Sequence, residues 1–157
     1  MEKAEFDKFA EEYHALHAAT VSASGETPQF FHEYKIADVR RLLARTVEPS
    51  AILDFGAGVG NSIPFFKTYF PNSELICSDV SEKSLAHAES RFPGMARRAL
   101  IENDRLPLPN ESVDLAFSAC VFHHIPHEAH QHWFRELLRV TRPGGRLVIF
   151  EHNPITR

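Results

Sequence analysis

The sequence contains little cysteine, little net charge and no long apolar run. Its 157 residues include two cysteines, Cys77 and Cys120, which lie in apolar runs without the spacing of a metal or redox site. We therefore expect buried, reduced thiols and no disulfide. The formal net charge of −4 and the pI near 6.2 exclude a general electrostatic attraction for nucleic acid or an anionic membrane. No window reaches the roughly 18 apolar residues that span a bilayer, and charged residues precede the first apolar run, which predicts a cytoplasmic chain.

The most informative stretch is a short apolar run that ends in three glycines at alternate positions. It reads Ala51-Ile52-Leu53-Asp54-Phe55-Gly56-Ala57-Gly58-Val59-Gly60. Glycines spaced this way allow positive φ and let a ligand approach where a Cβ would collide. The helix that follows, expected near residues 61–70, would point its free N–H groups at that ligand. The pattern predicts a strand that turns into a ligand-binding loop, although a glycine-rich turn without a ligand has the same spacing.

Two acidic residues follow apolar runs at positions that bear on the ligand. Asp54 lies two residues before the first glycine, where dinucleotide-binding loops usually carry an apolar residue. Its negative charge would repel a pyrophosphate, so a dinucleotide is disfavoured. Asp79 closes the apolar run of residues 75–78, where a second parallel strand would end. An acid at that point can bind the two hydroxyls of a ribose.

Short apolar runs alternate with helical stretches from Ala51 onward, which is typical of βαβ units in a parallel sheet. The expected ligand crevice lies at the carboxyl ends of the strands, where Asp54, Asp79, Glu102 and Ser118 fall. We predict strands near residues 51–55, 74–78, 97–101, 113–119 and 146–151, and helices near 61–70, 81–92 and 127–140.

Two helices are expected before the sheet. Aromatic and apolar residues recur at helical spacing over residues 4–19, and Pro28 opens a second helix that runs to about Arg45. We therefore divide the chain into a helical cap or lid over residues 1–50 and a core over residues 51–157. The aromatic residues of the cap either cover the ligand pocket or pack in the core, and both roles are compatible.

The sequence resembles the class I S-adenosylmethionine-dependent methyltransferases, and among them the small-molecule branch. The resemblance implies an α/β, Rossmann-like, doubly wound parallel sheet of order 3-2-1-4-5, without the antiparallel C-terminal strands of the family. It also implies that S-adenosylmethionine donates a methyl group to a small-molecule acceptor by in-line displacement. The resemblance rests on segments that occur in the order and at about the spacing of the family. They are residues 53–60, Asp79, residues 102–107, the run 113–118 leading to His123-His124, and residues 142–147.

The resemblance further implies which residues bind the donor. Asp54 would lie near its methionine end, and Asp79 would bind its ribose hydroxyls. Glu102 would accept from the adenine amine, although the family more often carries aspartate at that position. The full set implied for donor binding is Asp54, Gly56, Ala57, Gly58, Gly60, Asp79, Val80, Glu102, Asn103, Ser118 and Ala119.

His123 is the candidate general base. It follows the fourth predicted strand, faces the crevice in this topology, and carries a side chain that titrates near neutral pH. A hydroxyl acceptor benefits from such a base, whereas thiol and amine acceptors can react without one. The alternative is that His123 and its neighbour only cap and orient the next helix. We expect no metal, because the histidines of this region scatter around a helix without cysteine partners, namely His123, His124, His127, His130 and His132.

Two other functions remain open at this point. A nicotinamide-dependent oxidoreductase is argued against by the glycine spacing, by Asp54 and by the absence of a dehydrogenase-like catalytic set. The second alternative is a non-catalytic donor-binding or partner subunit. It stays open because family members usually continue beyond the fifth strand. The apolar run Leu147–Phe150 would then lie at a sheet edge, which predicts a homodimer through that edge. A shortened chain whose missing part completes the sheet and the acceptor pocket is the alternative.

Overall fold

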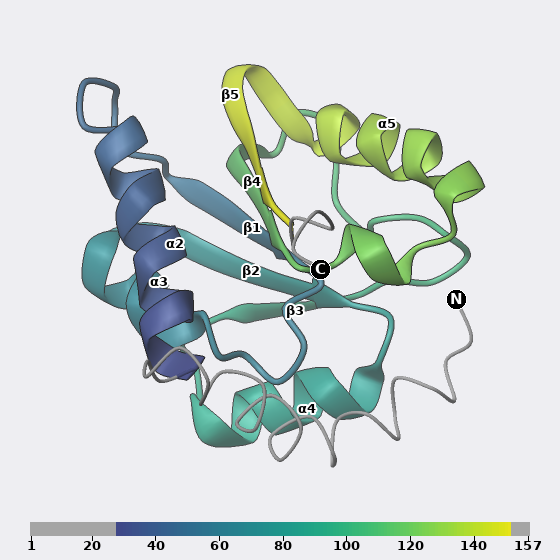
Figure 1. Cartoon of the computed structure of the whole chain (residues 1–157), viewed down its shortest axis with the longest axis horizontal. Coiled ribbons are helices and arrows are strands. Elements are labelled where there is room, and N and C mark those ends of the chain that lie inside the picture. The colour runs from purple at the N-terminus through teal and green to yellow at the C-terminus, as the bar shows by residue number, and fades with distance from the viewer. Residues whose placement is uncertain (1–27, 152–157) are drawn as a thin grey trace, which may run out of the picture.

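A parallel five-stranded sheet organises residues 28–151, the part of the chain that the computed structural model describes. The strand order is β3-β2-β1-β4-β5, and every neighbouring pair is parallel (Figure 1). The α/β fold class and the strand order predicted from the sequence are therefore confirmed. The strands are β1 (Ala51–Phe55), β2 (Glu74–Asp79), β3 (Arg97–Leu100), β4 (Val113–Ala119) and β5 (Thr141–Phe150).

The helices lie where the sequence predicts them, with shorter ends. The predicted helix over 127–140 begins as a 3-10 turn, and the cap helix ends three residues before the expected Arg45. Ser81 caps α4 (Glu82–Arg91), because its Oγ accepts from the N–H of Ser84 at 3.1 Å. The predicted helix over 4–19 lies outside the described residues. The helices are α2 (Pro28–Leu42), α3 (Ile63–Tyr69), α4 (Glu82–Arg91), α5 (His130–Val140) and the 3-10 turns η2 (Phe122–His124) and η3 (His127–Ala129).

Side chains that alternate along the central strands build a core on each face of the sheet. On β1, Ile52 packs into a cluster with α2, α3 and α4, while Leu53 packs into a second cluster with α5. Figure 1 shows the same division, with α2 and α3 along one face and α5 on the other. Both faces of the sheet are thus covered, as a parallel sheet requires. No helix within residues 28–151 is long and apolar enough to cross a bilayer.

The cap helix α2 is anchored in the core of the sheet. Ile36 and Val39 are fully buried and share a cluster with Phe66 and Phe70 beside α3. Residues 1–27 of the predicted cap lie outside the described residues, and the division of the chain at residue 50 stays a prediction. The packing fixes which side of α2 faces the sheet, and therefore the direction of the polar side chains that flank this apolar stripe.

The last strand begins earlier than the sequence predicts and has an irregular start. Val113 pairs with Thr141, but Leu115 pairs with Arg146, so the Arg-Pro-Gly-Gly segment forms a bulge at the start of β5. Gly145 is required there, because a Cβ would lie 2.8 Å from the carbonyl oxygen of Asp114. Within the described residues β5 pairs only with β4, and the residues of its apolar run Leu147–Phe150 are partly exposed.

Candidate ligand site at the carboxyl edge of the sheet

The parallel strands bring the predicted site residues to one edge of the sheet. Phe55 pairs with Ser78 on β2 and with Ser118 on β4, so the ends of these three strands are level. Asp54 and Asp79 therefore lie at the ends of neighbouring strands, and Ser118 lies at the end of the strand on the other side. The structure thus brings together at this edge residues that are remote from one another in the sequence.

The glycine loop after β1 bends back over the end of β2. The N–H groups of Gly56 and Ala57 both donate to the carbonyl oxygen of Ser78, at 2.8 and 3.0 Å. Gly58 N–H then donates to Oδ2 of Asp79 at 2.8 Å. All three glycines have positive φ, between 53° and 77°, as the spacing predicts. The loop and the acid of the second strand therefore form one hydrogen-bonded unit.

The three glycines serve different purposes. A Cβ on Gly56 would lie 2.5 Å from Cγ2 of Val121, and one on Gly60 would lie 2.7 Å from Cδ1 of Ile63. Those two positions are therefore required by the packing of the chain itself. A Cβ on Gly58 would meet no described atom within 4 Å. The space beside Gly58 is therefore open among the described residues, unlike the space beside the other two glycines.

The predicted role of the helix after this loop is wrong. The structure gives α3 only seven residues, and its first N–H groups are already bonded. Ile63 N–H donates to the carbonyl oxygen of Gly60, Pro64 has no N–H, and Phe65 N–H donates to the carbonyl oxygen of Ser62. The proline, visible in the sequence, removes one donor that the general pattern would supply. The first three positions of α3 therefore offer no free N–H group to a ligand.

Asp54 is a buried acid, with 3% of its surface exposed. Burial raises its pKa from 3.8 to about 7, a hydrogen bond from Ser62 opposes the rise, and the charges of Asp79 and Lys35 act in opposite directions. The Oγ of Ser62, the N-cap residue of α3, donates this hydrogen bond to Oδ2 of Asp54. A carboxyl group held in this way can gain or lose a proton near neutral pH, and a cation beside it would favour the ionised form.

Asp79 uses both carboxylate oxygens to hold the backbone around it. Oδ2 accepts from Gly58 N–H, and Oδ1 accepts from Ser81 N–H at 2.9 Å. A carboxylate oxygen has more than one lone pair, so each oxygen can accept more than one hydrogen bond. Val80, the neighbouring predicted site residue, is partly buried against the α5-side core.

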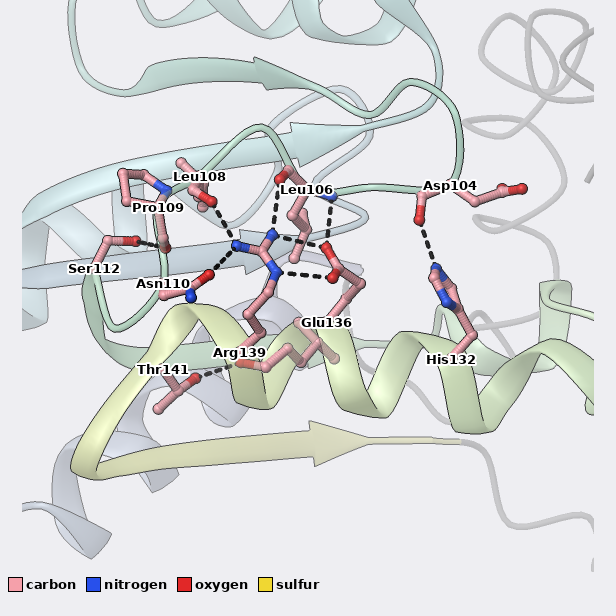
Figure 2. Close-up of polar contacts among 11 residues, drawn as sticks. Asp104, Leu106, Leu108, Pro109, Asn110, Ser112, His132, Glu136, Arg139 and Thr141 are labelled. Carbon is pink, nitrogen blue, oxygen red and sulfur yellow. Dashed lines mark hydrogen bonds and ion pairs between the residues drawn. The ribbon is translucent and has the colours of Figure 1, made fainter.

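The predicted adenine-edge residues Glu102 and Asn103 lie on the exposed loop after β3. Asn103 and Asp104 both have positive φ, near 51° and 53°. The loop is fastened to α5, because Nε2 of His132 lies 2.5 Å from the carbonyl oxygen of Asp104 (Figure 2). The conformation at this edge of the site is therefore set partly by a helix that is remote in sequence.

A second attachment of the same loop centres on Arg139. Figure 2 shows its guanidinium between α5 and the loop. Its Nε and Nη2 pair with the carboxylate of Glu136, both at 2.8 Å. Nη2 also donates to the carbonyl oxygen of Leu106, and Nη1 donates to that of Leu108. This bidentate bond is the main cause that lowers the pKa of Glu136. The sequence reading gave no role to either residue.

Ser118 and Ala119 are the last two residues of β4, at the carboxyl edge of the sheet. Ser118 is fully buried, and its Oγ has no hydrogen-bond partner among the described residues. A buried hydroxyl without a partner is uncommon in proteins, because its desolvation is not compensated. Ala119 is partly buried on the opposite face, where it packs against the α2-side core. Of the two residues, only Ser118 therefore has a buried polar group whose desolvation is not compensated by a hydrogen bond among the described residues.

His123 lies on η2 and is bonded to a residue that the sequence reading did not assign. Its Nδ1 lies 2.9 Å from Oε2 of Glu151, and Oε1 of Glu151 accepts from the N–H groups of Val121 and Phe122. Burial raises the pKa of Glu151, but the hydrogen bonds from His123 and the two N–H groups outweigh it and lower the pKa overall. Glu151 follows β5 directly, and its acidic side chain at a strand end was the available signal.

Lys35 is a second residue that the sequence reading missed. It projects from α2, and its Nζ donates to Sγ of Cys120 at 3.3 Å. The prediction that both thiols are buried is therefore wrong for Cys120, which is half-buried with φ of +59°, while Cys77 is buried as expected. The sequence offers no signal for this contact, because residues 35 and 120 meet only through the packing of α2 on the sheet.

The histidines of the region after β4 have separate partners. Nε2 of His130 lies 2.9 Å from the carbonyl oxygens of both Phe122 and Ile125, and His132 is bonded to the loop at Asp104. Within residues 28–151 no group of three or more histidine, cysteine or acidic side chains is arranged to hold a metal ion. A hollow of about 500 Å³ lies at the opposite edge of the sheet, beside Arg142 and Gly145, and contains none of the predicted site residues.

Comparisons with known proteins agree with this arrangement. Residues 53–149 match the family described as a methyltransferase domain. The chain is 39% identical over 102 residues to a malonyl-[acyl-carrier protein] O-methyltransferase of Methylococcus capsulatus, covering 64% of this chain and 36% of that protein. It is 33% identical over 124 residues to a trans-aconitate 2-methyltransferase of Acidovorax ebreus, covering 77% of this chain and 46% of that protein. The chain thus spans less than half the length of these curated relatives.

A solved structure supports the fold independently of close sequence similarity. The SAM-dependent methyltransferase of Aquifex aeolicus superposes with a TM-score of 0.69 at 20% identity, and the match covers 100% of this chain and 76% of that one. At this identity the likeness concerns the fold alone, and the family assignment rests on the match over residues 53–149. The chain belongs to the class I S-adenosylmethionine-dependent methyltransferases.

Proposed function

We propose that this chain binds S-adenosylmethionine at the carboxyl edge of its sheet and takes part in methyl transfer to a small-molecule acceptor. The observation that carries the proposal is the unit formed by Asp54, Asp79 and the glycine loop. Two buried carboxylates end neighbouring strands, and Gly58 between them leaves open space while its N–H binds Asp79. When bound, S-adenosylmethionine supplies an electrophilic methyl group on a sulfonium.

The residues present suit this donor in charge and in hydrogen bonding. Asp54 offers a carboxylate to the ammonium of the methionine end, and Asp79 offers carboxylate oxygens, which are hydrogen-bond acceptors, to the ribose hydroxyls. Ser118 offers a buried hydroxyl that has no partner among the described residues. A pyrophosphate would instead bring negative charge next to Asp54, which disfavours a nicotinamide dinucleotide.

The orientation of the donor, with its methionine end at Asp54 and its ribose at Asp79, also predicts the remaining donor-binding positions. With the ribose at Asp79, the exposed loop after β3 lies next along the sheet, and its residues Glu102 and Asn103 would meet the adenine edge. Their backbone is held by the contacts of α5 with Asp104 and Leu106. Ser118 and Ala119 would border the methionine moiety at the end of β4.

His123 is the general base of the proposal when the acceptor is a hydroxyl. The ionised Glu151 carboxylate can only accept a hydrogen bond, so Nδ1 of His123 carries the proton in this pair. The neutral ring then has its basic lone pair on Nε2. Glu151 itself is fixed by two backbone N–H groups, so it holds the ring in one orientation. This is the arrangement in which a histidine removes a proton with little reorganisation.

The relatives indicate the kind of acceptor to test first. The two curated relatives are named for methylation of a malonyl-[acyl-carrier protein] and of trans-aconitate. Both names describe acceptors that carry carboxylates. We therefore place small carboxylic acids and their thioesters at the head of the acceptor screen, followed by hydroxyl and amine metabolites.

We also propose a homodimer through the β5 edge. Within the described residues this edge has no paired strand, and the apolar side chains of Leu147–Phe150 are partly exposed along it. The start of β5 carries Pro143 and Arg146, but the run Leu147–Phe150 contains neither a charge nor a proline, and an exposed apolar edge of this kind tends to associate. A two-fold contact between two copies would cover the strand on both chains.

The experiment that tests the proposed reaction is transfer of a labelled methyl group from S-adenosylmethionine to the screened acceptors. For a hydroxyl acceptor, His123→Ala should lower turnover by about 10² to 10⁴-fold, with donor affinity nearly unchanged. Glu151→Gln should lower turnover and shift its pH profile, because the amide no longer stabilises the protonated ring. Donor binding without turnover on any acceptor would instead support a non-catalytic binding subunit.

A further inference from the structure

Lys35 is a cation that reaches the end of β4 and forms no ion pair among the described residues. Its hydrogen bond goes to the thiol of Cys120. A thiol is a weak acceptor, and an ammonium has three donors to satisfy. The side chain is half-buried, so part of its hydration is lost without compensation by a carboxylate. Such a group is suited to bind an anion.

The position of Lys35 is fixed by the core. The next residue, Ile36, is fully buried beneath α2, so the helix cannot rotate without exposing apolar surface. Its partner is held equally firmly, because Cys120 N–H donates to the carbonyl oxygen of Phe150 at 2.8 Å. Lys35 thus spans from α2 to the end of β4, on the strand next to the one that carries Asp54.

Lys35 and Asp54 provide opposite charges within one site. The ammonium of Lys35 is close enough to lower the pKa of Asp54, although burial of Asp54 dominates. A ligand with a carboxylate and an ammonium on the same carbon atom, such as the amino-acid end of a methionine derivative, matches this pair of charges. A carboxylate-bearing acceptor placed next to the donor would match Lys35 alone.

We propose that Lys35 is the carboxylate-binding residue of this site, with its ammonium donating to a ligand carboxylate in the crevice beside Cys120. The inference rests on the proposed function and adds to it a recognition residue on α2. The carboxylate comes either from the methionine end of the donor or from the acceptor. The two sources predict different results and are separated by experiment.

The test is calorimetric titration of the full chain with S-adenosylhomocysteine and with its decarboxylated analogue. If the carboxylate belongs to the donor, the wild type binds S-adenosylhomocysteine more than tenfold tighter than the analogue, and Lys35→Met removes this preference. Lys35→Arg should restore it in part, because the charge is kept. Lys67→Met, which removes a lysine that donates to the carbonyl oxygen of Ser73, is the matched control and should leave the preference intact.

The results differ if the carboxylate that Lys35 binds belongs to the acceptor. In that case Lys35→Met binds both nucleosides as the wild type does, but its KM rises more than tenfold for an acceptor that carries a carboxylate and not for the corresponding amide. The proposal is overturned if Lys35→Met changes neither the nucleoside preference nor this KM ratio. If the wild type fails to bind S-adenosylhomocysteine, the proposed function itself is overturned. The titration of the wild type therefore separates this failure from a failure of the Lys35 proposal.

Discussion

Asp54 gives a sharp test of the site through the stability of the protein. Burial raises its pKa in the folded chain from 3.8 to about 7. Between these two pH values the folded protein keeps a proton that the unfolded chain has released. The folded state therefore binds more protons than the unfolded state, and the free energy of unfolding falls as pH rises through this window. Below pH 3.8 the group contributes no cost, and above pH 7 the cost is complete.

The size of the effect follows from the difference between the two pKa values. It corresponds to about 4 kcal/mol of stability lost between pH 4 and pH 8. Asp54→Asn removes the charge and keeps a side-chain oxygen that can accept from Ser62. The difference in unfolding free energy between wild type and Asp54→Asn should therefore shift by about 4 kcal/mol, in favour of the variant, across this range.

The assay is urea unfolding at closely spaced pH values between 4 and 8. Glu128→Gln, which replaces an exposed acid, is the control and should show no comparable shift relative to wild type. Taking the difference between variants cancels the titration of all other groups that the substitution leaves undisturbed. A difference between wild type and Asp54→Asn that stays constant from pH 4 to pH 8 would refute the reasoning, because Asp54 would then titrate alike in both states.

Three further predictions concern other parts of the molecule. Gly56→Ala should be destabilised more than Gly58→Ala in thermal unfolding, because both strain a positive φ but only the first collides with a neighbour; equal losses would contradict the packing described. Arg139→Met should lower the unfolding free energy by about 2 kcal/mol, since it removes charge-assisted hydrogen bonds to the partly buried Glu136. The exposed Arg135→Met should change it little; equal losses would contradict this role of Arg139. Ile149→Lys should convert the proposed dimer to a monomer in size exclusion with light scattering; a wild type that is monomeric at tens of micromolar would defeat the edge contact.

The fold was largely predictable because its signals are local and repeat along the chain. Apolar runs separated by helical stretches determine the strands, and the parallel arrangement then follows from the length of the connections. The carboxyl edge was predictable for the same reason, since Asp54 and Asp79 each close an apolar run. The start of β5 was not, because the bulge at residues 142–145 depends on close contact with β4.

The contacts that complete the site depend on long-range packing, and the sequence carries little trace of them. Lys35 reaches Cys120 only because α2 lies across the sheet, and Glu151 reaches His123 only because β5 ends beside η2. The free N–H groups expected from α3 are absent for a local reason, since the helix begins late and contains Pro64 in its first turn. A motif pattern predicts where a loop lies, but it does not predict which backbone N–H groups are already hydrogen-bonded within the chain.

The central claim is that the carboxyl edge of the sheet binds S-adenosylmethionine, and titration calorimetry of the full chain tests it most directly. We predict that S-adenosylmethionine binds, that NAD does not, and that Asp79→Ala weakens S-adenosylmethionine by about tenfold to more than a hundredfold through the loss of charge-assisted hydrogen bonds. Circular dichroism should show that the variant is folded. Binding of NAD in place of S-adenosylmethionine, or an unchanged affinity in a folded Asp79→Ala, would contradict the account.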